Sequence, residues 1–226
     1  MEYRKFEKLG VSPSLLGFGC MRFPLNPDGS ICEEEAEKMV DTAIQAGVTY
    51  IDTAYPYHNG DSEPFLGRIL KKYNRKDYFL ATKLPIWNVK TLDDAKRLFD
   101  EQLQRLDTEY VDFYLLHCLD KERWQTVLDL NLIPYFEELK AQGKIRFFGF
   151  SFHDDYEVFE KNRHLPQMGF LPDSVQLCRH RYSGRGQRLC PYRKAWHSTC
   201  YYGACKGRFP FFPSGRSCSF PESRTS

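Results

Sequence analysis

The sequence predicts an α/β fold built on a parallel sheet: an incomplete (β/α)8-type barrel of about six βα units, followed by a disordered tail. Three observations support this prediction. Short β-branched and aromatic runs alternate with amphipathic segments at a spacing of roughly thirty residues, which is typical of βαβ units. Polar side chains follow four consecutive runs. The composition changes sharply near residue 177.

Six segments have the composition of buried strands. They span residues 14–19, 48–52, 78–82, 111–116, 145–150 and 174–177. Upstream of the first, residues 3–10 alternate weakly and predict a small hairpin with the residues that follow.

Helices are predicted between these strands from capping residues and helical periodicity. Ser30 and Glu33 have the spacing of a capping box, before a helix that ends at Gly47. Two further helices are expected to start near Ser62 and after Thr91, a possible cap. Two more are predicted over about 133–140 and about 154–163.

Both an open doubly wound sheet and a closed barrel fit this alternation. Asp52, Lys83, His117 and Ser151 follow four consecutive predicted strands. In barrels the reactive groups come from the carboxyl ends of several different strands, whereas an open sheet concentrates them at one switch point. The distribution therefore favours a barrel over residues 1–177.

The side chains at these strand ends form a set that can polarise a carbonyl group. The phenol of Tyr57 has an ordinary pKa of about 10, which a nearby Lys83 ammonium lowers while Asp52 holds the ammonium in place. A neutral His117 can donate a hydrogen bond to the carbonyl oxygen. Each residue taken alone also fits a structural role, as a solvated charge or a core residue. Their occurrence on successive strands favours one shared site.

Four motifs of the first 177 residues resemble those of the aldo/keto reductase family. Asp52 is followed five positions later by Tyr57, with Ser62 and Glu63 beyond, as in the signature of that family. The segments 81–83, 112–117 and 16–21 resemble its lysine strand, its histidine strand and its first-strand motif. The resemblance implies a TIM barrel.

The resemblance also implies an NAD(P)H-dependent oxidoreductase that reduces aldehydes or ketones to alcohols. In that activity Tyr57 is the acid/base, Asp52 and Lys83 tune its phenol, and His117 orients the carbonyl. The implied cofactor is NADP(H) or NAD(H), and its contacts are Gly19, Cys20, Met21, Asp52, Ser151 and Gln176. Phe152 stands where the family often has Asn. The alternative function is a non-catalytic, nicotinamide-binding regulatory subunit.

The composition limits the cellular locations and the classes of binding partner that we expect for the protein. No apolar run approaches membrane-spanning length, and the N-terminus lacks the apolar core of a signal peptide. We therefore expect a cytoplasmic protein with reduced thiols that acts on a small carbonyl compound, without membrane or nucleic-acid partners. The sequence specifies no oligomeric state.

Residues 178–226 differ in kind from the rest of the chain. They hold 10 basic and 1 acidic side chains and five of the eight cysteines, and Leu189 is their sole Val, Ile, Leu or Met. Such a segment cannot supply two buried strands and predicts a disordered tail. A basic nucleic-acid arm fits less well. A metal module fits least, because the cysteine spacings match neither paired zinc motifs nor iron–sulfur runs.

We interpret the change in composition as the result of a shifted reading frame, which the codons allow. Read one base later, residues 181–207 permit an amphipathic helix, a glycine turn and an apolar strand, which is the unit that the barrel lacks. Closure of a barrel gathers its strand ends around one centre. We therefore expect little or no activity from the 226-residue chain.

Overall fold

The computed structural model describes residues 1–7, 9–152, 175–178 and 199–201. Its centre is a seven-stranded sheet whose strands follow one another in chain order, with every neighbouring pair parallel. The strands are β1 (Gly17–Gly19), β2 (Tyr50–Asp52), β3 (Phe79–Leu84), β4 (Val111–Leu119), β5 (Ile145–Phe152), β6 (Val175–Cys178) and β7 (Thr199–Tyr201). This order confirms the predicted series of βα units.

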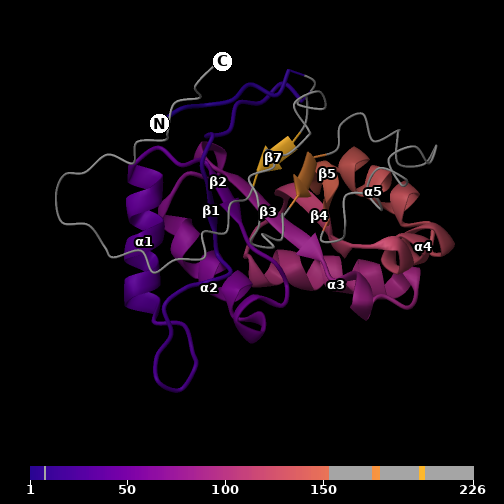
Figure 1. Ribbon diagram of the computed structural model, residues 1–226, viewed down its shortest axis with the longest axis horizontal. Helices are drawn as coiled ribbons and strands as arrows, with labels where there is room; N and C mark the ends of the chain where they lie inside the picture. Colours follow the sequence, from indigo (N-terminus) through magenta and orange to yellow (C-terminus); the bar gives the residue numbers. More distant parts are fainter. Residues whose placement is uncertain (8, 153–174, 179–198, 202–226) are drawn as a thin grey trace, which may run out of the picture.

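The described residues contain five α-helices, with α1 on the left of Figure 1 and α4 and α5 on the right. They are α1 (Glu33–Gln45), α2 (Ser62–Ile69), α3 (Leu92–Arg105), α4 (Lys121–Asp129) and α5 (Leu132–Ala141). Short 3-10 helices occupy Tyr57–Gly60 (η1), Leu70–Lys72 (η2), Arg75–Asp77 (η3) and Ile86–Asn88 (η4).

The two faces of the sheet are buried in different ways. Ile51 of β2 and Tyr114 of β4 belong to the larger apolar cluster, which also contains the inner faces of the helices. Tyr50 and Phe113, their neighbours along the same strands, belong to a smaller cluster on the opposite face. Successive side chains of a strand point to opposite faces, so both sides of this sheet are covered, as barrel strands require.

The N-terminal residues cover the smaller cluster. Tyr3 and Ser14 form one antiparallel bridge and Phe6 and Val11 form another, which confirms the predicted hairpin. Phe6 and Val11 are buried in the smaller cluster. The hairpin therefore closes one end of the inner face of the sheet.

Two helix starts differ in how they are capped. Thr91 caps α3 as predicted: its hydroxyl accepts from the Asp94 N–H, and the Asp94 carboxylate accepts from the Thr91 N–H. The capping box predicted at Ser30 is wrong. Helix α1 follows Cys32 without a side-chain cap, because the Ser30 hydroxyl and N–H both donate to Asp28 within the preceding turn.

Helix α4 was not predicted from the sequence. It has nine residues, of which only Trp124 and Val127 are buried, so its apolar periodicity is weak. Its start has a clear signal, since the Asp120 carboxylate accepts from the Arg123 N–H. The helix predicted over 154–163 lies outside the described residues.

Strand β7 lies within the segment for which the sequence predicts disorder. It pairs with β6 from Thr199 to Tyr201, and its β-branched and aromatic residue types favour extended backbone. The other residues of segment 178–226, apart from Cys178, lie outside the described residues, so their disorder stays a prediction. Within the described part of the chain, β1 and β7 are the two ends of the strand order.

Replacing Gly67 by Ala is expected to destabilise the protein by about 3 kcal/mol, because α2 crosses α3 with no room for a side chain. A Cβ at Gly67 would lie 2.4 Å from the backbone oxygen of Arg105. The measurement is the free energy of unfolding in urea. Gly29→Ala is the control: its Cβ meets nothing within 4 Å, and only its φ of +87° opposes the change, at about 1 kcal/mol. Equal losses in the two variants would contradict the packing argument.

Candidate active site

Four polar side chains lie at the carboxyl ends of four adjacent strands. Asp52 is the last residue of β2, Lys83 the penultimate residue of β3, and Ser151 the penultimate residue of β5. His117 lies near the end of β4. All four are buried, with 2–5% of their surface exposed. The parallel order brings these residues to one edge of the sheet, as the sequence predicts.

The Lys83 ammonium is the centre of the site. Its Nζ donates to the Asp52 carboxylate at 2.6 Å, to the Thr53 carbonyl at 2.7 Å and to the Tyr57 hydroxyl at 3.2 Å. These three acceptors satisfy the three donors of the ammonium group. Lys83 therefore fixes the phenol oxygen of Tyr57 relative to the end of β2.

Burial affects the protonation of both the Tyr57 phenol and the Lys83 ammonium. It raises the pKa of Tyr57, while the Lys83 ammonium opposes the rise. The lowering expected from the sequence is present as a contribution but is outweighed. Burial by itself lowers the pKa of Lys83, but Asp52 and Tyr57 raise it above its ordinary value. At neutral pH the site therefore holds a charged ammonium beside a phenol that keeps its proton.

His117 lies against the Tyr57 ring. The two ring centroids are 5.9 Å apart and the ring planes are nearly perpendicular, at 80°. The ring centroid of the Trp87 indole, from η4, lies 5.1 Å from that of the imidazole, and Trp87 is 44% exposed. An imidazole, a phenol and an exposed indole thus border one surface, which suits a small organic molecule.

A bulge in β4 follows His117 directly. Cys118 has a positive φ of 56°, and the register between β4 and β5 shifts there. The Cys118 N–H donates to the Ser151 hydroxyl at 2.8 Å, and the Arg123 guanidinium donates to the Cys118 carbonyl at 2.7 Å. Ser151, predicted as a cofactor contact, therefore also holds the backbone beside His117 in place.

The other predicted cofactor residues lie around the end of β2. Gly19 pairs with Asp52, and the Cys20 N–H donates to the Asp52 carbonyl at 2.8 Å. The Cys20 thiol is buried, which raises its pKa, whereas Met21 is 40% exposed. Gln176 lies four strands further along the sheet, on β6, in register with Phe150. A buried Asp52 oxygen, Oδ2, has no hydrogen-bond partner among the described residues, so an acceptor at this end is available to a bound group.

Sequence reasoning missed two parts of the site. Trp87 gave a weak signal, a lone tryptophan after a strand. Glu63 is wholly buried, although it was noted in the sequence only as part of a motif. Tyr55, two residues before Tyr57, has a different partner: the Tyr55 hydroxyl donates to Glu101 of α3 at 3.2 Å.

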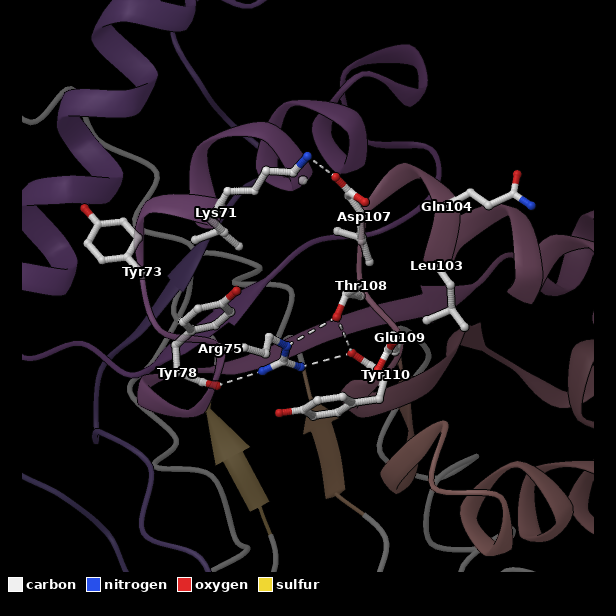
Figure 2. A pocket seen from close by; sticks show the side chains of 13 residues that line it. Lys71, Tyr73, Arg75, Tyr78, Leu103, Gln104, Asp107, Thr108, Glu109 and Tyr110 are labelled. Atoms are coloured by element: carbon white, nitrogen blue, oxygen red, sulfur yellow. Dashed lines mark hydrogen bonds and ion pairs between the residues drawn. The ribbon is translucent and has the colours of Figure 1, made fainter.

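A cavity of about 580 Å³ lies at the opposite end of the strands (Figure 2). Its centre is Arg75, whose guanidinium lies between the rings of Tyr78 and Tyr110 and donates to the carbonyl oxygens of both. The same guanidinium also binds Asp112 at 2.7 Å. Because Tyr78 and Tyr110 immediately precede β3 and β4, this cavity is remote from Lys83. Its central charge is satisfied within the protein.

Among the described residues, no group of three or more His, Cys, Asp or Glu side chains is placed to hold a metal ion. No described helix combines the length and the apolar character that crossing a membrane requires.

The chain belongs to the aldo/keto reductase family, whose model matches residues 15–178. It is similar to L-galactose dehydrogenase from Arabidopsis thaliana, with 36% identity over 66% of this chain and 48% of that protein. It is also similar to the aldo-keto reductase YhdN from Bacillus subtilis, with 32% identity over 67% of this chain and 47% of that protein. The chain thus spans about half the length of these curated relatives.

Solved structures agree with the fold. The holo form of aldo-keto reductase AKR11C1 from Bacillus halodurans has 29% identity and a TM-score of 0.62, over 80% of this chain and 58% of that one. An aldo-keto reductase from Klebsiella pneumoniae, solved in complex with NADPH, has 23% identity and a TM-score of 0.57, over 74% of this chain and 55% of that one. The α/β fold of the described residues is therefore that of the aldo/keto reductase barrels, as predicted.

Proposed function

We propose that this protein reduces the carbonyl group of small aldehydes or ketones to an alcohol, with NADP(H) or NAD(H) as the hydride donor. The observation that supports it best is the Lys83 ammonium, which joins Asp52 and Tyr57 beside His117 at the carboxyl ends of the strands. The NADPH in the solved relative from Klebsiella pneumoniae supports the choice of cofactor.

The proposed mechanism assigns one role to each side chain. The nicotinamide, when bound, supplies the hydride to the carbonyl carbon. Tyr57 gives its hydroxyl proton to the carbonyl oxygen, and Lys83 stabilises the phenolate that remains. Asp52 keeps the ammonium charged and in place, and the His117 imidazole orients the carbonyl oxygen. A phenol whose pKa is raised by burial holds this proton at neutral pH, which suits reduction.

The residues proposed to hold the nicotinamide are the six predicted from the sequence. Gly19, Cys20 and Met21 lie at or just after the end of β1, and Asp52 ends β2 with an oxygen, Oδ2, that has no hydrogen-bond partner among the described residues. Ser151 and Gln176 lie on β5 and β6. Exposed Met21 offers apolar surface for a ring, and Ser151 and Gln176 have the polar side chains that a carboxamide requires.

We expect the 226-residue chain to have little or no turnover, because residues 178–226 do not have the composition of the strands and loops that complete a barrel. The test mixes the purified chain with NADPH and a reactive aldehyde and follows the nicotinamide absorbance. The comparison is a frame-restored chain, made from the same coding DNA read one base later after codon 177. Robust turnover by the 226-residue chain as it stands would contradict the expectation, and sequencing the DNA around codon 177 tests the frame shift itself.

The same assay separates the proposal from its alternative. Turnover by the frame-restored chain supports a reductase, whereas tight nicotinamide binding without turnover would identify a regulatory subunit. The cytoplasmic location expected from the sequence is part of this proposal. It is supported by the three described cysteines, Cys20, Cys32 and Cys118, all of which are free thiols.

A further inference from the structure

A buried carboxylate lies behind the site, between β3 and two helices. Glu63 of α2 has no exposed surface. Its Oε1 accepts from the Thr82 hydroxyl at 2.6 Å and from the Gln102 amide at 2.7 Å. The same amide of Gln102, on α3, donates to the backbone carbonyl of Lys83 at 3.1 Å. Glu63 is thus one side chain away from the backbone that carries the central ammonium.

The same face of α3 also holds the segment that carries Tyr57. We call residues 53–61, between β2 and α2, the Tyr57 loop. At its start, the Tyr55 ring lies under the Arg105 guanidinium, at 4.1 Å. At its end, Arg105 donates to the Gly60 carbonyl at 3.5 Å. Arg105 also lies 3.8 Å from Glu63 Oε2, so one cation links the buried carboxylate to both ends of the loop.

The backbone of the Tyr57 loop needs such anchors. His58 and Asn59 have φ values of 53° and 56°, in the left-handed region that residues with a side chain rarely adopt. A conformation of this kind persists only where surrounding contacts hold it. The strained residues directly follow Tyr57, so a change in the anchors is transmitted to the phenol.

The charge of Glu63 changes in the neutral pH range. Burial raises its pKa to about 7, against the hydrogen bonds from Thr82 and Gln102 and the charges of Arg105 and Lys83. Tyr114 of β4 faces the same network, where its hydroxyl donates to Gln102 at 2.9 Å. Since the pKa lies above its ordinary value, Glu63 is a carboxylate at alkaline pH and takes up a proton as the pH falls through about 7. Arg105 then loses one of the two carboxylate charges that it faces, and its ion pair with Glu101 of α3 remains.

We infer that Glu63 is a positioning residue for Tyr57 and Lys83. Through Gln102 it holds the backbone of Lys83, and through Arg105 it holds the Tyr57 loop against α3. The inference rests on the proposed function for its purpose, because Tyr57 is the proposed acid, but the geometry itself does not require turnover. It follows that the surroundings of the Tyr57 phenol change when Glu63 takes up a proton.

The test is a pH titration by NMR of the 226-residue chain, with 13C at tyrosine Cζ and glutamate Cδ. Tyr57→Phe and Glu63→Gln assign the two resonances by their disappearance. We expect the Glu63 resonance to titrate with a midpoint of about 7 and the Tyr57 resonance to shift with the same midpoint. In Glu63→Gln the Tyr57 shift near neutrality is expected to vanish. In Glu35→Gln, which changes an exposed carboxylate of α1, it is expected to persist.

Two outcomes would overturn the inference: a Tyr57 resonance that stays constant while Glu63 titrates, or a shift that survives in Glu63→Gln. Where Glu63→Gln does not fold, the Glu63 resonance is identified in the wild-type titration as the glutamate signal with a midpoint of about 7, and the Tyr57 resonance, assigned by Tyr57→Phe, either shifts with it or does not. No turnover enters this measurement, so it is independent of the reductase assay. A coupled titration together with no turnover by the frame-restored chain would support the positioning of Tyr57 and reject the proposed function, and turnover by the frame-restored chain with no coupling would do the reverse.

Discussion

Replacing Lys83 by Met is expected to lower the free energy of unfolding by about 3–5 kcal/mol, because it leaves the Asp52 carboxylate buried without its cation. Lys83 and Asp52 lie 2.6 Å apart and their side chains are 4% and 3% exposed. Burying one charge alone costs several kcal/mol even after the surroundings relax. The measurement is urea unfolding at pH 7, with the midpoint and the slope both determined.

The control for this variant is Lys72→Met. Lys72 makes two ion pairs of the same length, with Glu37 and Asp41, but its side chain is 37% exposed. Water and salt screen such pairs, and we expect a loss of at most about 1 kcal/mol. The double variant Asp52→Asn, Lys83→Met removes both charges and is expected to recover part of the loss. Similar losses in the two lysine variants would show that burial of the Lys83 pair has no special cost.

The pH dependence of the Lys83 variant gives a further check. Burial raises the pKa of Asp52, with Lys83 opposing the rise, so removal of the ammonium raises it further. A group whose folded pKa is raised stabilises the protein at low pH and loses that contribution as the pH rises through the folded value. The deficit of the variant is therefore expected to be smaller at pH 4 than at pH 7.

Replacing Tyr57 by Phe in the frame-restored chain is expected to lower kcat by about 100- to 10,000-fold, the usual contribution of a positioned general acid. The variant keeps the ring that packs against His117 and loses the hydroxyl that Lys83 binds at 3.2 Å. Since the proton is transferred only in the reaction, we expect KM to change much less than kcat. Steady-state rates with NADPH and a reactive aldehyde measure both quantities.

Tyr55→Phe is the matched control for the loss of a phenol hydroxyl. Tyr55 lies two residues away, but its hydroxyl binds Glu101 of α3. Its ring, which the variant keeps, lies under Arg105. We expect kcat to fall by less than tenfold, because this hydrogen bond to the Glu101 carboxylate contributes to stability, where such bonds are worth about 1.5–3 kcal/mol, and does not contact the reacting groups. Equal losses in the two variants would reject the assignment of the acid to Tyr57.

Local patterns in the sequence predict most of the framework. The six predicted strands are present as β1 to β6, and helices α1, α2, α3 and α5 are where periodicity places them. These elements bury continuous or periodic apolar runs, so the residues that define them are neighbours along the chain. The same reasoning predicts that Asp52, Lys83 and His117 meet, because adjacent parallel strands share one carboxyl edge.

The predictions from the sequence fail where the structure of a segment depends on a residue that is distant in the sequence or on a competing hydrogen-bond partner. Ser30 does not cap α1, because Asp28 takes both of its donors. Helix α4 buries only Trp124 and Val127, so its apolar periodicity is too short to predict a helix from the sequence alone. The net rise in the pKa of Tyr57 depends on how deeply the folded chain buries the phenol, and residue types alone do not determine that depth.

The sequence by itself therefore determined strands β1 to β6, helices α1, α2, α3 and α5, the family resemblance and the meeting of Asp52, Tyr57, Lys83 and His117, because each depends on short-range periodicity or on motif spacing. Only the tertiary structure decided which groups are ion-paired, strained or buried. Glu63 shows why: its partners Thr82, Gln102 and Arg105 lie 19 to 42 positions away in the sequence. Its wholly buried carboxylate and its pKa of about 7 arise only when β3, α2 and α3 pack together.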